Sequence, residues 1–173
     1  MSEALTYFRD LSYTASAVTF LLPDMDRSVV FTGSQLPLTD MLSDGPANLR
    51  TAFAMAASSC PGVFLAFDRK VMLGCRAVKV RASGFSAFES VNARYVATVS
   101  NRGLVVDESV LPRPRGNARL CLKLSREVFL LKLTPGLNPA IFDMLAAMGY
   151  RGIVIEAFGL GGVNVLHKGL RGI

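Results

Sequence analysis

Val71-Met-Leu-Gly-Cys-Arg-Ala-Val-Lys-Val80 is an apolar run that is broken by one glycine and ends beside a lysine. It follows a second apolar run, Gly62-Val-Phe-Leu-Ala-Phe67, and the polar stretch Asp68-Arg-Lys70 lies between the two. Two apolar runs of strand length, joined by a short polar stretch, predict a β-hairpin. Lys79 follows on a short apolar segment, and a lysine held in apolar surroundings can carry protons in catalysis.

Two helices and one strand are expected before this hairpin. Residues 12–22 and 46–58 have the apolar spacing of helices, and Pro46 is typical of a first helical turn. The residues expected to form one apolar face are Tyr13, Ala17, Phe20 and Leu21 in the first helix, and Leu49, Phe53 and Ala56 in the second. Between the helices, Arg27-Ser-Val-Val-Phe-Thr32 predicts a strand, and residues 36–46 predict a loop.

The pattern after the hairpin indicates a change of domain. Residues 86–92 are expected to form a short helix, whereas residues 101–125 contain two prolines and many charges and are expected to be a linker. A strand at 127–133, a helix at 139–148 and a strand at 153–158 then predict a β-α-β unit. The expected fold is therefore α/β with parallel strands. The expected division is a domain at 1–108, a linker at 109–126 and a second domain at 127–173.

Apolar residues make up 51% of the chain and the mean hydropathy is +0.38, which is high for a soluble protein. Parallel strands buried on both faces raise this value, and so does apolar surface that a missing segment or a partner would cover. We expect both explanations to apply. Every apolar run is shorter than the roughly 18 residues of a membrane span, and MSEALTYFRD lacks the pattern of a signal peptide. We therefore expect a cytoplasmic protein without a membrane partner.

The charged residues and the cysteines narrow the function classes further. The net charge is +6, but the basic residues are scattered apart from a group within 113–126 that has no interleaved aromatics, so nucleic acid is not an expected partner. Cys60, Cys75 and Cys121 are widely spaced, as is typical of free thiols in a reducing compartment. His167 is the only histidine, so we expect no metal, no cofactor and no Ser-His-Asp triad.

Several segments, taken in order, resemble the L-asparaginase/glutaminase family, and in particular its bacterial cytoplasmic, type I-like branch. The segments that carry the resemblance are Tyr13-Thr-Ala-Ser-Ala17, Val29-Val-Phe-Thr-Gly-Ser-Gln-Leu-Pro37, Ser43-Asp-Gly45, residues 71–80, Leu131-Lys-Leu-Thr-Pro-Gly136 and Gly149-Tyr-Arg-Gly-Ile-Val-Ile-Glu-Ala-Phe-Gly159. The resemblance implies a partial N-terminal asparaginase domain with a parallel or mixed sheet. It also implies that the start of the smaller α/β C-terminal domain follows.

The resemblance also implies a chemistry. Enzymes of this family hydrolyse the side-chain amide of L-asparagine, and sometimes of L-glutamine, to a carboxylate and ammonia. A threonine attacks the amide carbon, and a lysine that is hydrogen-bonded to a second threonine helps to move the proton. By motif, Lys79 is the catalytic lysine, and Gly33 and Ser34 are the substrate-binding residues. Family enzymes are homo-oligomers, so a homo-oligomer is the expected assembly.

The sequence departs from the family at the nucleophile. No Thr-Gly-Gly-Thr-Ile-like turn occurs in it, and Thr6-Tyr-Phe-Arg-Asp-Leu-Ser12 does not spell the Gly-Thr-Asp-Thr motif. Asp10 is one position away from the family's aspartate and is not equated with it. We therefore expect a chain that is truncated at both ends and is inactive alone. The alternatives are a non-catalytic chain that associates with a full-length homologue, and a different hydrolase or binding module on a similar scaffold.

Overall fold

The computed structural model describes residues 11–159 and 162 of the chain, which divides into two compact units, Met1–Leu122 and Lys123–Ile173. The first unit is built on a five-stranded sheet with the order β1-β2-β3-β6-β7. Its strands are β1 (Ser28–Phe31), β2 (Gly62–Phe67), β3 (Lys70–Leu73), β6 (Ala97–Ser100) and β7 (Gly103–Val106). β1 runs parallel to β2, and the other pairs are antiparallel. The sheet is therefore mixed, as the resemblance implies.

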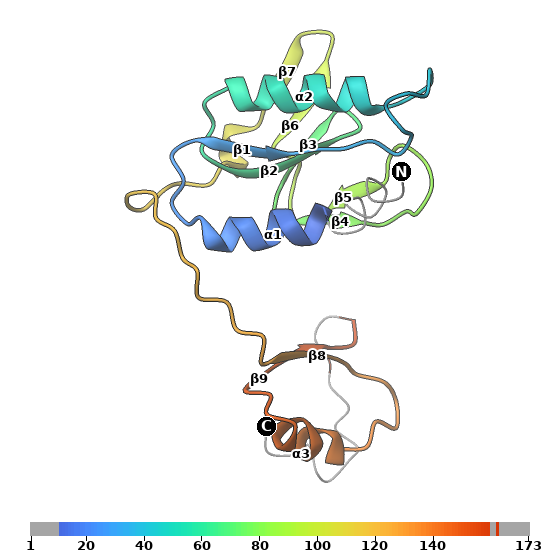
Figure 1. The fold of residues 1–173 in the computed structure, drawn as a ribbon, viewed down its shortest axis with the longest axis vertical. Helices are drawn as coiled ribbons and strands as arrows, with labels where there is room; N and C mark the ends of the chain where they lie inside the picture. Colours follow the sequence, from blue (N-terminus) through green and yellow to red (C-terminus); the bar gives the residue numbers. More distant parts are fainter. Residues whose placement is uncertain (1–10, 160–161, 163–173) are drawn as a thin grey trace. The chain divides into compact units, whose positions relative to one another are not determined.

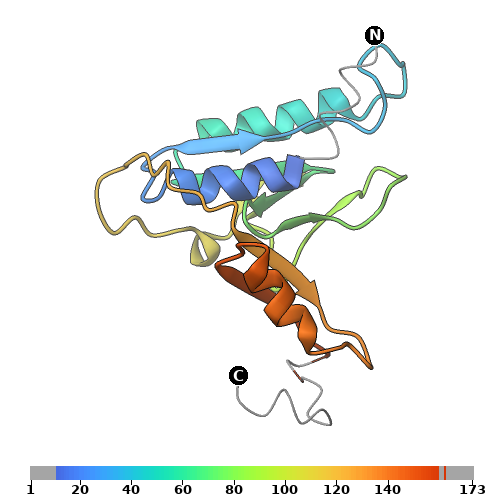
Figure 2. The ribbon, with the colours of Figure 1, turned by 60° about the horizontal axis from the view of Figure 1, so that its bottom comes forward.

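Two helices cover opposite faces of this sheet: α1 (Leu11–Leu21) lies on one face and α2 (Gly45–Ala57) on the other (Figures 1 and 2). Side chains alternate between the two faces along β2. Leu65 and Phe67 pack in the cluster that contains Ala15 of α1, whereas Phe64 packs in the cluster that contains Met55 of α2. Both faces of β2 are thus buried, which explains its continuous apolar sequence.

The predicted hairpin is confirmed, and its turn is tight. β2 pairs with β3 up to Phe67 opposite Lys70, so Asp68 and Arg69 alone form the loop. Both have positive φ, 47° and 59°, as a type I′ turn requires. This turn presents the backbone N–H of Asp68 to Asn48 near the start of α2, where the candidate site lies.

The short helix expected at residues 86–92 is wrong. β4 (Ala77–Lys79) and β5 (Phe88–Ser90) form an antiparallel pair in which Lys79 lies opposite Phe88. Phe88 is almost fully buried, and its ring packs against Phe67 with the centroids 5.0 Å apart. Pairing with β4 and burial of Phe88 therefore override the weak local helical pattern.

Both helices are confirmed, but the apolar face expected of each is not the buried one. In α1, Ala15 is fully buried while Tyr13 and Phe20 are 77% and 64% exposed. In α2, the buried residues are Gly45, Asn48, Thr51, Ala52 and Met55, whereas Leu49 and Phe53 are exposed. The buried face of each helix carries small or hydrogen-bonding residues, which allow the helix to lie close to the sheet. The larger apolar side chains lie on the exposed face.

The expected linker at residues 101–125 is wrong for its first part. That part contains β7, which is an edge strand of the sheet, and a short 3₁₀ helix, η1 (Glu108–Val110). Residues 111–126 contain neither helix nor strand. The division of the chain at 108 and 126 stays a prediction.

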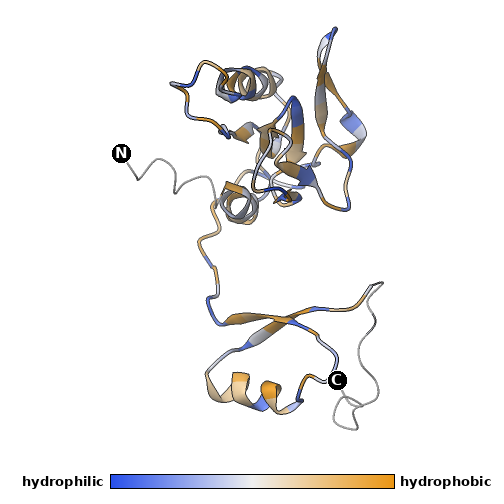
Figure 3. Cartoon of the chain, turned by 90° about the vertical axis from the view of Figure 1, so that its right-hand side faces the viewer, coloured by the Kyte–Doolittle hydropathy of each residue, from blue (hydrophilic) through white to orange (hydrophobic). Residues whose placement is uncertain are grey.

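The predicted β-α-β unit is confirmed in the second compact unit. β8 (Val128–Lys132) and β9 (Gly152–Glu156) are parallel, and α3 (Ala140–Ala147) connects them. Leu131, Leu133 and Leu145 are the buried apolar residues among the described residues of this unit. Leu130 and Val154 are exposed, and apolar colouring marks both strands in Figure 3. Across residues 11–159 and 162, no helix has the length and hydropathy that a membrane crossing needs.

Candidate functional site

The loop that follows β1 is held by Asp44, the residue that immediately precedes α2. The Asp44 carboxylate accepts hydrogen bonds from the backbone N–H of Gln35, at 2.8 and 3.0 Å to its two oxygens, and from that of Leu36 at 3.1 Å. Asp44 does not cap its own helix with its side chain. Its carboxylate instead fixes the backbone of the Gly33–Leu36 loop, because a carboxylate is a strong acceptor for adjacent N–H groups.

Asn48 extends this attachment into the core. Its side chain is 1% exposed, and its Nδ2 donates to the Gly33 carbonyl at 2.8 Å and to Asp44 Oδ2 at 2.9 Å. Its Oδ1 accepts from the backbone N–H of Asp68 at 2.9 Å. One buried amide thus joins the loop after β1, the start of α2 and the β2–β3 turn.

Lys79 lies at the end of β4, and its ammonium points to this loop. Nζ donates to Gln35 Oε1 at 3.3 Å and lies 5.9 Å from the centroid of the Phe88 ring. The side chain is only partly exposed. The sequence-predicted lysine and the sequence-predicted loop therefore meet through Gln35, which is one residue beyond Ser34.

Gly33 and Ser34 both form hydrogen bonds within the protein. The Gly33 carbonyl accepts from Asn48, and the Ser34 hydroxyl donates to the Leu36 carbonyl at 2.6 Å. Ser34 is 9% exposed. The structure thus brings Gly33, Ser34 and Lys79 to one place, and their roles in substrate binding and catalysis stay predictions.

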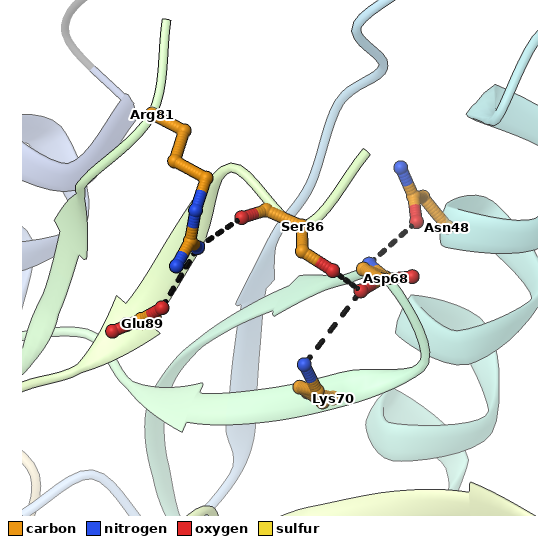
Figure 4. Close-up of polar contacts among 6 residues, drawn as sticks. All are labelled: Asn48, Asp68, Lys70, Arg81, Ser86 and Glu89. Carbon is orange, nitrogen blue, oxygen red and sulfur yellow. Dashed lines mark hydrogen bonds and ion pairs between the residues drawn. The ribbon is translucent and has the colours of Figure 1, made fainter. Parts of the chain in front are cut away.

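A second polar cluster lies on the other side of the β2–β3 turn (Figure 4). The Asp68 carboxylate accepts a short hydrogen bond from Ser86 Oγ and forms an ion pair with Lys70 Nζ at 3.6 Å. Arg81 Nη1 donates to the Ser86 carbonyl at 2.9 Å and to Glu89 Oε1 at 2.7 Å. These groups are partly exposed, so they contribute little to stability individually. They fix the two ends of the segment 81–86.

The sequence motifs include Gln35 and Asp44, but sequence reasoning did not predict the contacts that these residues, Asn48 and Asp68 make. Asn48 could have been noticed as an amide four residues after Asp44, since residues four apart share one face of a helix. Nothing local marks Gln35 or Asp68, because their partners come from distant segments. Within the described part of the chain, no group of three or more His, Cys, Asp or Glu side chains could hold a metal ion. Asp10 and His167 lie outside the described residues.

A mixed sheet with a helix on each face, and a lysine-bearing strand beside the loop after its edge strand, define the first unit as an α/β domain. The family described as "Asparaginase, N-terminal" matches residues 10–111, which is more than half of the 173 residues. The chain belongs to the asparaginase family, as the sequence motifs predicted.

Three comparisons show the extent of the similarity. The chain is 40% identical over 163 residues to the L-asparaginase of Thermococcus kodakarensis, covering 92% of this chain and 48% of that protein. It matches the structure of L-asparaginase I from Vibrio cholerae with a TM-score of 0.81 and 27% identity, covering 93% of this chain and 49% of that one. It is also 34% identical over 154 residues to the human 60 kDa lysophospholipase, covering 87% of this chain and 27% of that protein.

The chain thus spans about half the length of the asparaginases that it matches. The name of the human relative refers to a different activity. Family membership alone therefore does not assign a substrate to this chain.

Proposed function

We propose that this chain supplies the lysine side of an asparaginase-type site, which hydrolyses the side-chain amide of L-asparagine to L-aspartate and ammonia. Lys79 moves the proton, and Gly33 and Ser34 line the substrate pocket. The observation that supports this proposal is the hydrogen bond of Lys79 Nζ to Gln35, which places a cationic amine beside the loop that the family motif assigns to substrate. L-Glutamine is the second amide to be tested.

The chain alone is expected to be inactive. A hydrolysis of this kind needs a hydroxyl nucleophile with a proton carrier beside it, and the family's threonine motifs do not occur in this sequence. The 173-residue chain should therefore release no more ammonia from L-asparagine than its Lys79→Ala variant does. A clear rate that depends on Lys79 would contradict this expectation.

A chimera tests the role of Lys79. In the Thermococcus kodakarensis L-asparaginase, the residues that match Tyr13 onward of this chain are replaced by those of this chain, so that the enzyme keeps its own residues before that point. We expect the chimera to release ammonia from L-asparagine, and Lys79→Ala in the chimera to lower kcat by about 10²- to 10⁴-fold, the usual contribution of a positioned proton carrier. Lys70→Ala, which removes another partly exposed lysine, is the control and should retain most of the activity. Equal rates for the two variants would refute the role of Lys79.

We further propose a setting for this reaction: the cytoplasm, in a homo-oligomer, without a metal or cofactor and without nucleic acid or membrane as partner. The three cysteines, Cys60, Cys75 and Cys121, are all unpaired in the structure, in keeping with a reducing compartment. Oligomer formation and cytoplasmic location rest on the family resemblance.

A second candidate function is a non-catalytic chain that associates with a full-length asparaginase homologue. The observation that favours it is β1, which among the described strands pairs with β2 alone and carries the apolar sequence Ser28-Val-Val-Phe31 at the sheet edge. Apolar edge strands without charges or prolines favour pairing with another chain. Co-purification with a full-length homologue from the same cells is expected. Recovery of the chain only by itself would count against this function.

A further inference from the structure

Gln35 is the only glutamine of the chain, and its side chain contacts two segments that are distant in sequence. Its Oε1 accepts from Lys79 Nζ at 3.3 Å. Its Nε2 donates to the Gly84 carbonyl at 2.9 Å and approaches the Ala82 carbonyl at 3.4 Å. One amide therefore connects the loop after β1 to β4 and to the segment between β4 and β5.

The backbone from which this side chain extends is itself fixed. Asp44 accepts from the backbone N–H of Gln35 with both carboxylate oxygens, and Asn48, which is buried, donates to Asp44. The backbone of Gln35 is thus fixed by Asp44, the residue before α2, and through it by Asn48 of α2, an element that does not carry Lys79. A chain of hydrogen bonds through Gln35, Asp44 and Asn48 consequently connects the Lys79 ammonium to the core of the first unit.

The segment 81–86 is exposed and has few other attachments. Its ends are held by Arg81 Nη1 on the Ser86 carbonyl and by Ser86 Oγ on the Asp68 carboxylate. Within the part of the chain that the structure describes, the middle of the segment, at Ala82 and Gly84, is held by Gln35. Gly84 has a φ of +90°, a conformation that glycine adopts without strain.

An amide is the group that suits both neighbours at once. Its oxygen accepts from the ammonium, and its NH₂ donates to the two carbonyls. A glutamate in its place keeps the acceptor for Lys79 but sets a carboxylate against the carbonyl oxygens of Ala82 and Gly84. A methionine fills a similar volume and makes neither kind of hydrogen bond.

We propose that Gln35 is a positioning residue that orients the Lys79 ammonium through its carbonyl oxygen and fastens the segment 81–86 through its NH₂ group. The inference deepens the proposed function, since it concerns the lysine that moves the proton there. It does not require that the chain hydrolyse any amide, and it is tested without turnover.

Two chemical probes measure the two contacts separately in the full chain. Acetic anhydride at limiting concentration reports the reactivity of Lys79, read by mass spectrometry against Lys132, which pairs with Glu156 and not with Gln35. Brief treatment with trypsin reports cleavage after Arg81, and so the opening of the segment. In Gln35→Met, both acetylation of Lys79 and cleavage after Arg81 should become about 3- to 10-fold faster, the change expected on losing a hydrogen bond.

Gln35→Glu separates the acceptor from the donor. Acetylation of Lys79 should stay at or below the wild-type rate, because the carboxylate still accepts from the ammonium. Cleavage after Arg81 should be as fast as in Gln35→Met, because the donor to Ala82 and Gly84 is gone. The proposal is overturned if Gln35→Met leaves both rates within about twofold of wild type, or if Gln35→Glu releases Lys79 as fully as Gln35→Met does.

The wild-type chain provides a measurement that does not depend on folding of the variants. The Nε2 resonance of the single glutamine is unique, and ¹⁵N relaxation gives its order parameter. A tethered amide should approach the rigid-backbone value of about 0.85, whereas a value below about 0.6 would overturn the proposal. Inactivity of the chimera would refute the proposed function and leave these three measurements standing.

Discussion

Asn48 is the residue whose loss should disturb the candidate site most. It donates to Gly33 and Asp44, accepts from the Asp68 N–H and is almost fully buried. Asn48→Ala removes the partner of the Gly33 carbonyl and of the Asp68 N–H, both in partly buried residues, and an unsatisfied buried group costs about 1–3 kcal/mol. We expect the free energy of unfolding to fall by roughly 2–4 kcal/mol in urea titrations that follow circular dichroism.

Asn101 offers a matched control, because it is an exposed asparagine in the turn between β6 and β7. Asn101→Ala should change the free energy of unfolding by less than about 0.5 kcal/mol. If Asn48→Ala were as mild as Asn101→Ala, the three hydrogen bonds of Asn48 would not be what holds the loop, the helix and the turn together.

The same residues show how far the sequence could predict the site. The motif placed Lys79 and the Gly33–Ser34 loop near one another, and the structure brings them together through Gln35. Apart from the four-residue spacing of Asp44 and Asn48, pattern analysis could not predict the contacts of the connecting residues. An isolated asparagine or glutamine has no periodicity, and its partners are chosen by tertiary packing of segments up to 49 residues apart.

At the scale of elements, Gly74 sets how closely α1 can approach the sheet. A Cβ on Gly74 would lie 2.8 Å from the Ala15 carbonyl oxygen, 2.8 Å from Thr19 Oγ1 and 3.1 Å from Val63 Cγ1. The first of these atoms belongs to the helix backbone, so relief requires a shift of the whole helix. Gly74→Ala should therefore destabilise the chain by about 1–3 kcal/mol, as overpacking does, measured by thermal and urea unfolding.

Gly116→Ala is the control for this substitution. The nearest atom to a Cβ at Gly116 is Asp24 Oδ2 at 3.8 Å, which is an ordinary contact. This variant should keep the wild-type midpoint. An unchanged midpoint for Gly74→Ala as well would mean that α1 adjusts freely and that its packing on the sheet is loose.

Helices and strands were predicted best where a pattern in neighbouring residues is enough to determine the element. The continuous apolar run of β2 and the polar turn after it predicted the hairpin, because burial on both faces and a two-residue turn each have a local signature. β5 was mistaken for a helix, because its three residues are too few for a period and it is defined by pairing with β4. The buried faces of α1 and α2 were also missed. Close approach at Gly74 and hydrogen bonding by Asn48 favoured small and polar residues over larger apolar ones.

For the whole molecule, burial of β2 and exposed apolar side chains both contribute to the high mean hydropathy, and a segment or partner that covers the exposed ones stays a prediction. β2 is buried along its whole length, as expected of a strand in the middle of a covered sheet. Apolar side chains are also exposed on the surface, among them Met41 at 96% and Phe53 at 70%. The apolar fraction therefore measures the core and the uncovered surface together, and composition alone could not separate them.

The two compact units should differ in local stability, because their sheets differ in size and cover. In the first unit, β2 has a strand on each side and a helix on each face. In the described part of the second, β8 and β9 form a two-stranded sheet on which Leu130 is 64% exposed and Val154 is 55% exposed. Two-stranded sheets are marginal in water, and local opening is fastest where few apolar contacts are buried.

Hydrogen exchange followed by mass spectrometry measures this difference directly. Amides of β2 and β3 should exchange slowest, and those of β8 and β9 on the order of 100-fold faster. Met72→Ala removes a fully buried side chain of β3 and should speed exchange in β2 and β3, whereas Leu131→Ala should do so in β8 and β9. Equal protection of both sheets in the wild-type chain would contradict the argument. It would mean that β8 and β9 gain stability from contacts beyond their own pairing, and the exposed side chains Leu130 and Val154 would be the first place to look for them.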